Sequence, residues 1–364
     1  MNAITDLEDL HVRREGAAGR ITLNRPKALN SLTLNMVHSF ATALDGWAED
    51  DSVRVVIIDG SGARGLCAGG DVRALNNSEA CGDGMAETFW RNEYRLNVDI
   101  ASYPKPVVAF MDGIVMGGGV GISAHASCRI VTEKTMLAMP EVGIGLLPDV
   151  GGTWLLSKCP GEVGTYLALT GTRIDGSDAI YAGLADYFLQ SERLPDLAKA
   201  LGEAGDGDVE AIVRSFAGAP GPAPLTLRAA AIDMMFSHDT VERCLEAARS
   251  LGDARSLGDE WAAGVAREMA AKSPTSLKVT LAALRQARTL GILEDCLNME
   301  FRIISRMFHG PDFREGVRAT LIDKDQLPCW QPASLSEVSE AAVFAHFAPL
   351  GPNELGLTPA SKSI

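Results

Sequence analysis

Two carboxylates near the middle of the chain stand among residues that can change their chemistry. Glu141 and Asp149 both lie within Met139–Gly152, which otherwise holds only methionine, proline, glycine and aliphatic residues. An apolar neighbourhood raises the pKa of a carboxyl group and suits it to acid–base or nucleophilic work at neutral pH. The structural alternative is that Glu141 caps a helix and Asp149 is a turn residue before two glycines. From these residues alone, both interpretations stay open.

Two glycine-rich segments are a second chemical signal. They are Leu66–Asp71, with the sequence LCAGGD, and Met116–Gly121, with MGGGVG. Small residues let a ligand approach the backbone closely, and two N–H groups that converge on one carbonyl oxygen form an oxyanion hole. Tight turns and close packing of a helix on a strand are the alternative use of such glycines. Neither segment has the spacing of a phosphate-binding or dinucleotide-binding loop.

Glu93 and His125 are weaker candidates. A glutamate on an expected helix is more often solvated or ion-paired than catalytic. His125 follows the second glycine-rich segment, where a lone histidine is more often structural. The sequence has neither metal-ligand spacing nor an order of serine, histidine and aspartate that suggests a triad, so we expect no metal and no redox cofactor.

Alternating strands and helices are expected to position these residues. Hydrophobic periodicity predicts strands at 11–14, 20–24, 53–59, 107–110 and 129–132, and helices at 33–47 and 85–102. This is the pattern of an α/β protein up to about residue 190. After a connector rich in proline and glycine at 217–225, the pattern becomes mainly helical, and Ser273-Pro274 is a helix-start signal.

Composition limits the partners and the compartment. The chain has 364 residues and a net charge of −14, which argues against a nucleic acid or an anionic membrane as the main partner. Seven cysteines without a CxxC pair argue against a disulfide framework and for a reducing compartment, which we expect to be the cytoplasm. Met1–Leu10 has no apolar run, so neither a signal peptide nor a transit peptide is expected. No apolar stretch is long enough to span a bilayer.

Several segments, in order, resemble the enoyl-CoA hydratase/isomerase, or crotonase, superfamily. The segments typical of the superfamily are Asn24–Leu32, Cys67–Asp71, Asp112–Gly119 and Met139–Thr153. The segments typical of its 3-hydroxyisobutyryl-CoA hydrolase subgroup are Asn92–Asn97, Ser273–Leu281, Met299–Arg302 and Asp312–Asp325. The resemblance covers nearly the whole chain. It implies a crotonase-like α/β fold, with a spiral core of ββα repeats at residues 1–205 and a mainly helical C-terminal region at residues 206–364.

The resemblance also implies roles for individual residues. Glu141 and Asp149 match catalytic positions, and the oxyanion hole is assigned to the backbone N–H groups of Ala68 and Gly118. Glu93 and Gly118 match positions that contact the substrate, together with the two catalytic carboxylates. The core would also hold the CoA part of the substrate, through Lys27, Ala28, Leu29, Ala68, Gly69, Gly70 and Asp71.

The type of reaction depends on one glycine. Typical hydratases of this superfamily carry a second glutamate where this chain has Gly121. Its loss and the presence of Asp149 favour hydrolysis of a thioester over hydration. Two departures from the subgroup, at Ala126 and Leu147, predict a reshaped acyl pocket.

The implied reaction is hydrolysis of a short 3-hydroxyacyl-CoA, 3-hydroxyisobutyryl-CoA above all, in valine catabolism. It uses no cofactor apart from the CoA of the substrate, and a homo-oligomer is compatible with it. The alternatives are an enoyl-CoA hydratase or isomerase on the same scaffold and an acyl-CoA-binding protein without catalysis.

Overall fold

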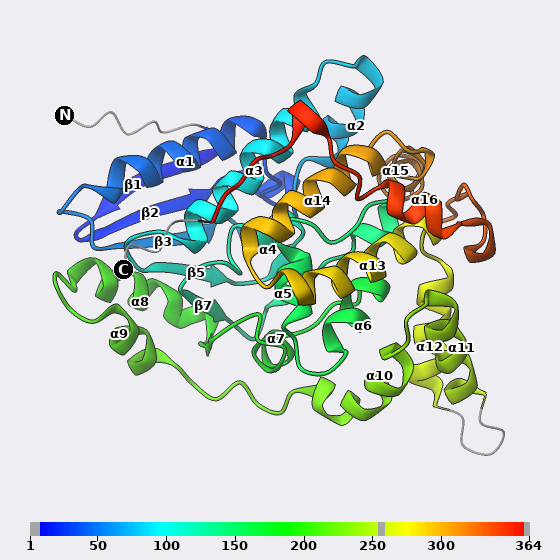
Figure 1. Ribbon diagram of the computed structural model, residues 1–364. Helices are drawn as coiled ribbons and strands as arrows, with labels where there is room; N and C mark the ends of the chain where they lie inside the picture. Colours follow the sequence, from blue (N-terminus) through cyan, green and yellow to red (C-terminus); the bar gives the residue numbers. More distant parts are fainter. Residues whose placement is uncertain (1–7, 254–258, 360–364) are drawn as a thin grey trace.

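A six-stranded sheet supports the N-terminal half of the molecule (Figure 1). The computed structural model describes residues 8–253 and 259–359, so most of the segment on which the expectation about a leader rests lies outside the described residues. The strand order is β1-β2-β3-β5-β7-β9, in which β1 and β2 form an antiparallel hairpin and the other neighbours are parallel. The strands are β1 (Leu10–Glu15), β2 (Ala18–Leu23), β3 (Val55–Gly60), β5 (Val107–Met111), β7 (Cys128–Val131) and β9 (Tyr187–Phe188).

A second, three-stranded parallel sheet turns the chain into a spiral. Its strands are β4 (Gly65–Cys67), β6 (Ile114–Met116) and β8 (Met136–Ala138). Each follows a strand of the large sheet and precedes a helical segment, so the repeats of two strands and a helix implied by the resemblance are confirmed. Periodicity did not predict these strands because three residues are too few to show an alternation.

Helices make up the rest of the regular structure. Those of the N-terminal part are α1 (Leu34–Ala48), α2 (Val72–Cys81), α3 (Met85–Ala101), α4 (Gly118–Gly121), α5 (Gly152–Ser157), α6 (Val163–Thr170), α7 (Gly176–Tyr181), α8 (Leu194–Glu203) and α9 (Val209–Phe216). Later in the chain come α10 (Ala229–Phe236), α11 (Val241–Gly252), α12 (Glu260–Ala270), α13 (Pro274–Leu290), α14 (Leu293–Met307), α15 (Pro311–Val317) and α16 (Glu340–Ala345). Beyond residue 205, every regular element of the described ranges is helical, while the boundary itself stays a prediction.

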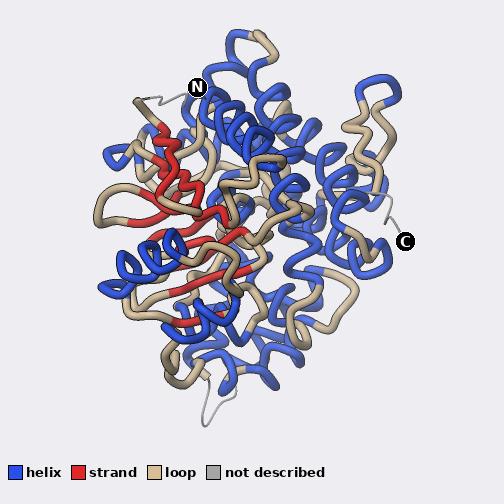
Figure 2. The backbone as a smooth tube through the Cα atoms, turned by 90° about the vertical axis from the view of Figure 1, so that its left-hand side faces the viewer, coloured by secondary structure: helices blue, strands red, loops and turns tan. Residues whose placement is uncertain are grey.

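Apolar layers cover both faces of the large sheet. Along β3, Val55 and Ile57 belong to a cluster with α8 and α9, whereas Val56 and Ile58 belong to the main core with α1 and α3. All four side chains are fully buried, as expected of a parallel strand between two layers of helices. Figure 1 shows α1 and α3 above the sheet and α8 and α9 below it, and Figure 2 shows the strands side by side among the helices.

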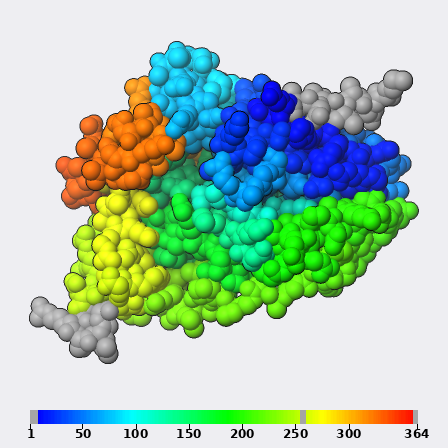
Figure 3. Space-filling view, turned by 180° about the vertical axis from the view of Figure 1, so that it is seen from behind, coloured from blue at the N-terminus to red at the C-terminus, as the bar shows by residue number. Residues whose placement is uncertain are grey.

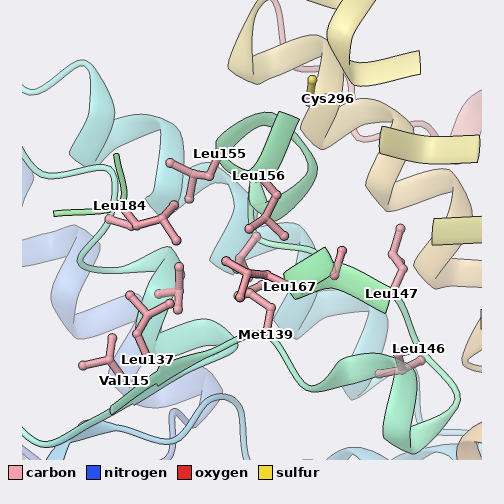
Figure 4. Close-up of a cluster of buried hydrophobic side chains, with 14 of the residues drawn as sticks. Val115, Leu137, Met139, Leu146, Leu147, Leu155, Leu156, Leu167, Leu184 and Cys296 are labelled. Carbon is pink, nitrogen blue, oxygen red and sulfur yellow. The ribbon is translucent and has the colours of Figure 1, made fainter. Parts of the chain in front are cut away.

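The C-terminal helices pack directly on the spiral core. Leu155 and Leu156 of α5 belong to the same buried cluster as Val115 and Leu137 of the small sheet, and all four are labelled in Figure 4. Helix α13 then packs on α5 and α6, and α14 packs on α3. The predicted start of α13 is confirmed, because the Ser273 hydroxyl accepts a hydrogen bond from the backbone N–H of Ser276, the third residue of the helix. In the part of the chain that the structure describes, no helix is both long and apolar enough to cross a membrane.

Candidate active site

A cavity of about 580 Å³ lies where the glycine-rich loops face the C-terminal helices. Three buried carboxylates, those of Glu93, Glu141 and Asp149, line it together with both glycine-rich segments, and the exposed Glu268 lines it as well. Residues from the C-terminal region, Lys272 and Gln326 among them, complete its wall. In Figure 3 the orange part of this region lies against the cyan segment around α2, and the yellow part lies below it. The cavity is therefore built by both parts of the chain.

The main-chain donors at the cavity differ in part from those predicted. The Ala68 N–H donates a 3.0 Å hydrogen bond to the Leu29 carbonyl, so the oxyanion-hole assignment of Ala68 is contradicted: this donor is already engaged. Two residues on, the Gly70 N–H has no acceptor in the described chain, and neither has the N–H of Gly118 at the start of α4. A Cβ atom placed on Gly118 would lie 3.4 Å from the Gly70 nitrogen. Gly70 and Gly118 therefore adjoin one another with free donors.

The second glycine-rich segment also lets two carboxylates approach the backbone closely. A Cβ atom on Gly118 would lie only 2.4 Å from Glu93 Oε1, and one on Gly117 would lie 2.8 Å from Glu141 Oε1. Both are closer than a real side chain tolerates. A side chain at Gly118 would therefore push Glu93 Oε1 out of its place beside the backbone.

Glu93 and Glu141 are buried and incompletely hydrogen-bonded. Glu93, on α3, is 2% exposed, and its Oε1 has no partner among the described residues; the same holds for Glu141 Oε2. Burial, and next the charge of Asp149, raise the pKa of both carboxyl groups well above the usual range. Glu141 makes no side-chain cap to the 3-10 turn that it begins. The structural alternatives for these two residues, a solvated position and a helix cap, are therefore wrong.

Asp149 is both a turn residue and a buried carboxylate of the cavity, the two alternatives of the sequence analysis. Its carbonyl accepts a 2.6 Å hydrogen bond from Gly152 in a turn, while its side chain accepts a 2.7 Å hydrogen bond from the hydroxyl of Tyr94. Burial raises the pKa of Asp149 to about 6, although the Tyr94 bond lowers it. The sequence analysis missed Tyr94; its position next to Glu93 in the Asn92–Asn97 block was the available signal.

Glu300 is a second residue that sequence reasoning missed. It lies on α14, is fully buried, and accepts hydrogen bonds from Gly151 and Thr153, directly after Asp149. Burial raises its pKa to about 8 in spite of these donors. Its place in the Met299–Arg302 block was the only signal in the sequence.

The predicted CoA-binding residues divide into two groups. Ala68, Gly69 and Gly70 line the cavity, whereas residues 27–29 form or follow a short 3-10 turn outside its lining. Asp71 caps α2 and forms a 3.0 Å ion pair with Arg25, so its side chain is engaged in the fold. Residues at the cavity wall that were not predicted include Thr172, Arg173, Lys272, Thr320 and Gln326.

His125 and the two departures at Ala126 and Leu147 belong to the core. His125 Nε2 hydrogen-bonds to the Val150 carbonyl at 2.8 Å, and burial lowers the histidine pKa to about 4, so the structural interpretation is correct. Ala126 and Leu147 are buried and absent from the cavity lining; the neighbouring Leu146 lines it instead. These departures therefore do not form the cavity wall. Within the described ranges, no group of histidine, cysteine or acidic side chains is arranged to hold a metal ion.

A comparison with known protein families identifies the family of this chain. The family described as enoyl-CoA hydratase/isomerase matches residues 18–347. This chain belongs to the enoyl-CoA hydratase/isomerase family. Among its curated relatives, the protein named 3-hydroxyisobutyryl-CoA hydrolase, mitochondrial, from Danio rerio is 42% identical over 350 residues, which are 94% of this chain and 90% of the relative. The protein of the same name from Homo sapiens is 40% identical and covers 96% of this chain and 90% of its own length.

Solved structures confirm the crotonase-like fold of this family member. A carnitinyl-CoA dehydratase from Mycobacterium thermoresistibile is 46% identical, with a TM-score of 0.90 over 96% of this chain and 98% of that one. An enoyl-CoA hydratase from Rhodobacter sphaeroides is 39% identical, with a TM-score of 0.89 over 96% and 100% of the two chains. These two proteins are named after reactions other than that of the curated relatives.

The cytoplasmic prediction is contradicted by the names of the curated relatives, which are mitochondrial enzymes. The prediction rested mainly on cysteines, all seven of which are free in the structure. Free cysteines are expected in any reducing compartment, so they could not distinguish one such compartment from another.

Gly121 occupies the position at which the sequence analysis expects a second glutamate in hydratases. A Cβ atom at Gly121 would lie 2.7 Å from Val150 Cβ and 2.9 Å from Asn97 Nδ2. Val150 and Asn97 thus fill the space that a side chain at this position would need. The second glutamate expected of hydratases is absent here, and its place is closed.

Proposed function

We propose that this protein hydrolyses 3-hydroxyisobutyryl-CoA to 3-hydroxyisobutyrate and CoA, a reaction that would serve valine catabolism. One observation carries the choice of reaction: Glu141 and Asp149 line one cavity, while Val150 and Asn97 leave no room at Gly121 for a second glutamate of the hydratase type. The names of the curated relatives support the choice of substrate. The proposed reaction needs no metal or redox cofactor, because water and carboxylates supply its chemistry.

In this proposal the thioester carbonyl oxygen lies between the N–H groups of Gly70 and Gly118. Negative charge builds on that oxygen when the carbonyl carbon is attacked, and two fixed donors stabilise it. This role is supported by the two N–H groups having no acceptor among the described residues and by Gly70 and Gly118 lying next to one another. Loss of one such donor commonly lowers the rate by about 10²–10³-fold.

Glu141 would drive the attack on the carbonyl carbon. Its raised pKa makes its ionised form a strong base, and its unpartnered oxygen is free to act. In one route Glu141 removes a proton from water, whose oxygen bonds to the carbonyl carbon while the carbon–sulfur bond breaks. In the other route Glu141 itself forms that bond, and water then hydrolyses the mixed anhydride. In both routes CoA leaves as a thiolate and takes up a proton.

Asp149 and Glu93 would act on the water and on the acyl group. The Tyr94 hydroxyl fixes one oxygen of Asp149, which leaves the other to orient the attacking water. Glu93 Oε1, buried without a partner beside Gly118, is suited to bond the 3-hydroxyl of the substrate. A site built to bond a hydroxyl strongly disfavours an analogue that lacks it, because its polar group is then left unpaired.

Hydration of an enoyl-CoA is the second candidate, because similar structures are titled as a hydratase and a dehydratase. A panel of short acyl-CoAs separates the candidates when both thiol release and loss of the enoyl absorbance are followed. We expect thiol release from 3-hydroxyisobutyryl-CoA and little hydration of crotonyl-CoA. Hydration without thiol release would refute the proposal, and binding without either reaction would indicate an acyl-CoA-binding protein.

A further inference from the structure

Glu300, which is distant from Asp149 in the sequence, hydrogen-bonds to the turn that carries Asp149. Its Oε2 accepts a 2.7 Å hydrogen bond from the Gly151 N–H, and its Oε1 accepts the Thr153 N–H at 2.9 Å and the Thr153 hydroxyl at 2.5 Å. These donors surround the first turn of α5, where helix N–H groups have no partner within the helix. A carboxylate of α14 therefore caps α5, and Asp149 lies directly before the capped segment.

A buried carboxylate is an expensive way to achieve packing alone. Glu300 is fully buried, and no lysine or arginine pairs with it in the described ranges. Burying an ionisable group is unfavourable unless hydrogen bonds compensate, and an apolar residue of similar size would fill the same space at lower cost. The three hydrogen bonds are thus the specific contribution of Glu300, and all three act on the segment after Asp149.

The turn itself is strained, which explains why it needs to be held. Val150, between Asp149 and Gly151, has a φ of 53°, and a β-branched residue with positive φ is a rare outlier. Such a conformation persists only where the surroundings fix it. His125 holds the Val150 carbonyl from one side, and Glu300 holds the next N–H from the other.

We propose that Glu300 is a positioning residue for thioester hydrolysis: from α14 it fixes the strained turn so that Asp149 stays in place beside the substrate. Asp149 is then held twice, by Tyr94 through its side chain and by Glu300 through the backbone that follows it. The inference rests on the proposed function, since it names what keeps the catalytic carboxylate in position.

Glu300→Gln tests this role with little change in shape. The amide has one acceptor oxygen and a donor group, so at least one of the three donors at the turn loses its partner. We expect kcat for 3-hydroxyisobutyryl-CoA to fall about 10- to 100-fold in the folded variant with little change in KM, the scale on which misplaced groups affect catalysis. Glu294→Gln, the same change at a partly exposed position of α14, is the matched control and should leave kcat unaltered.

A second pair of variants keeps the test decisive if Glu300→Gln does not fold. Thr153→Val removes the hydroxyl donor and Thr153→Ser retains it, so kcat should fall in the first and recover in the second. Combined with Glu300→Gln, Thr153→Val should lower kcat by less than the product of the two single effects, because both act through one contact.

The outcomes distinguish this inference from the function on which it rests. Lower thermal stability with unchanged kcat in Glu300→Gln, or equal kcat in the two Thr153 variants, would overturn the positioning role alone. A wild-type protein that releases no thiol from 3-hydroxyisobutyryl-CoA would overturn the proposed function, and the positioning role with it.

Discussion

Asp149→Asn is expected to stabilise the folded protein while it removes turnover. Burial raises the pKa of Asp149 from 3.8 to about 6. Each unit of difference between these two pKa values corresponds to about 1.4 kcal/mol. At pH 7 the ionised side chain therefore costs the folded state about 3 kcal/mol. The new amide N–H donors of the asparagine lack acceptors, which costs about 1 kcal/mol. The expected net gain in the free energy of unfolding is therefore about 2 kcal/mol at pH 7.

The gain should depend on pH in a defined direction. Because the folded state raises the pKa of Asp149, the protonated side chain favours folding; this contribution is complete below pH 3.8 and is lost as pH rises through about 6. Asparagine does not titrate, so the advantage of the variant should grow between these values. At the acidic end only the cost of about 1 kcal/mol for the unpaired amide donors remains, so the variant should be slightly less stable than wild type there. In the Asp149→Asn variant, kcat for thioester hydrolysis should fall by at least about 10²-fold at neutral pH, as expected for a lost acid–base group.

Urea unfolding of wild type and variant from pH 4 to pH 8, alongside thiol release, provides the assay. Asp239→Asn, at an exposed position, is the control and should change neither quantity. A variant that is less stable than wild type at pH 7, or a stability difference that does not vary with pH, would refute the reasoning that Asp149 is ionised at a cost to folding.

Substitutions at three other positions test single contacts of the site. Gly70→Pro removes the proposed oxyanion donor and should lower kcat by about 10²–10³-fold, whereas Gly70→Ala keeps the N–H and should retain most activity; equal rates in the two variants would exclude this donor. Tyr94→Phe removes a hydrogen bond that lowers the pKa of Asp149, so the acidic limb of the kcat profile should move above pH 6, and an unmoved limb would contradict the assignment. Wild type should prefer 3-hydroxyisobutyryl-CoA to isobutyryl-CoA by about 10²-fold or more in kcat/KM, and Glu93→Ala should shrink this ratio; an unchanged ratio would remove Glu93 from hydroxyl recognition.

The sequence was informative where chemistry follows from a local motif. The carboxylates Glu93, Glu141 and Asp149 were predicted to belong to one site, and the structure brings them to one cavity. The N–H of Ala68, which was assigned to the oxyanion hole, is hydrogen-bonded to Leu29, and the free N–H lies two residues later, at Gly70. The Leu29 carbonyl accepts the N–H of Ala68, so its position decides which N–H of this loop stays free. That position depends on the fold and cannot be read from the loop sequence.

Long-range contacts explain what the sequence analysis missed. Tyr94 bonds to Asp149 across 55 positions, and Glu300 bonds to Gly151 across 149 positions. No periodicity or spacing connects residues so far apart, although both lie in blocks on which the family resemblance depends. The C-terminal wall of the cavity was missed for the same reason, because Lys272 meets the spiral core only after the helices have packed.

Product analysis in heavy-oxygen water tests the central claim most directly. Wild-type protein is incubated with 3-hydroxyisobutyryl-CoA, and the acid, the free thiol and any unsaturated thioester are measured together. We predict equal amounts of CoA thiol and 3-hydroxyisobutyrate, with solvent oxygen in the new carboxylate. In a single turnover, label in Glu141 would indicate the anhydride route with water attacking the Glu141 carbonyl carbon. Label in the product acid alone would indicate that water attacks the acyl carbon. Formation of the α,β-unsaturated thioester without release of thiol would contradict the account.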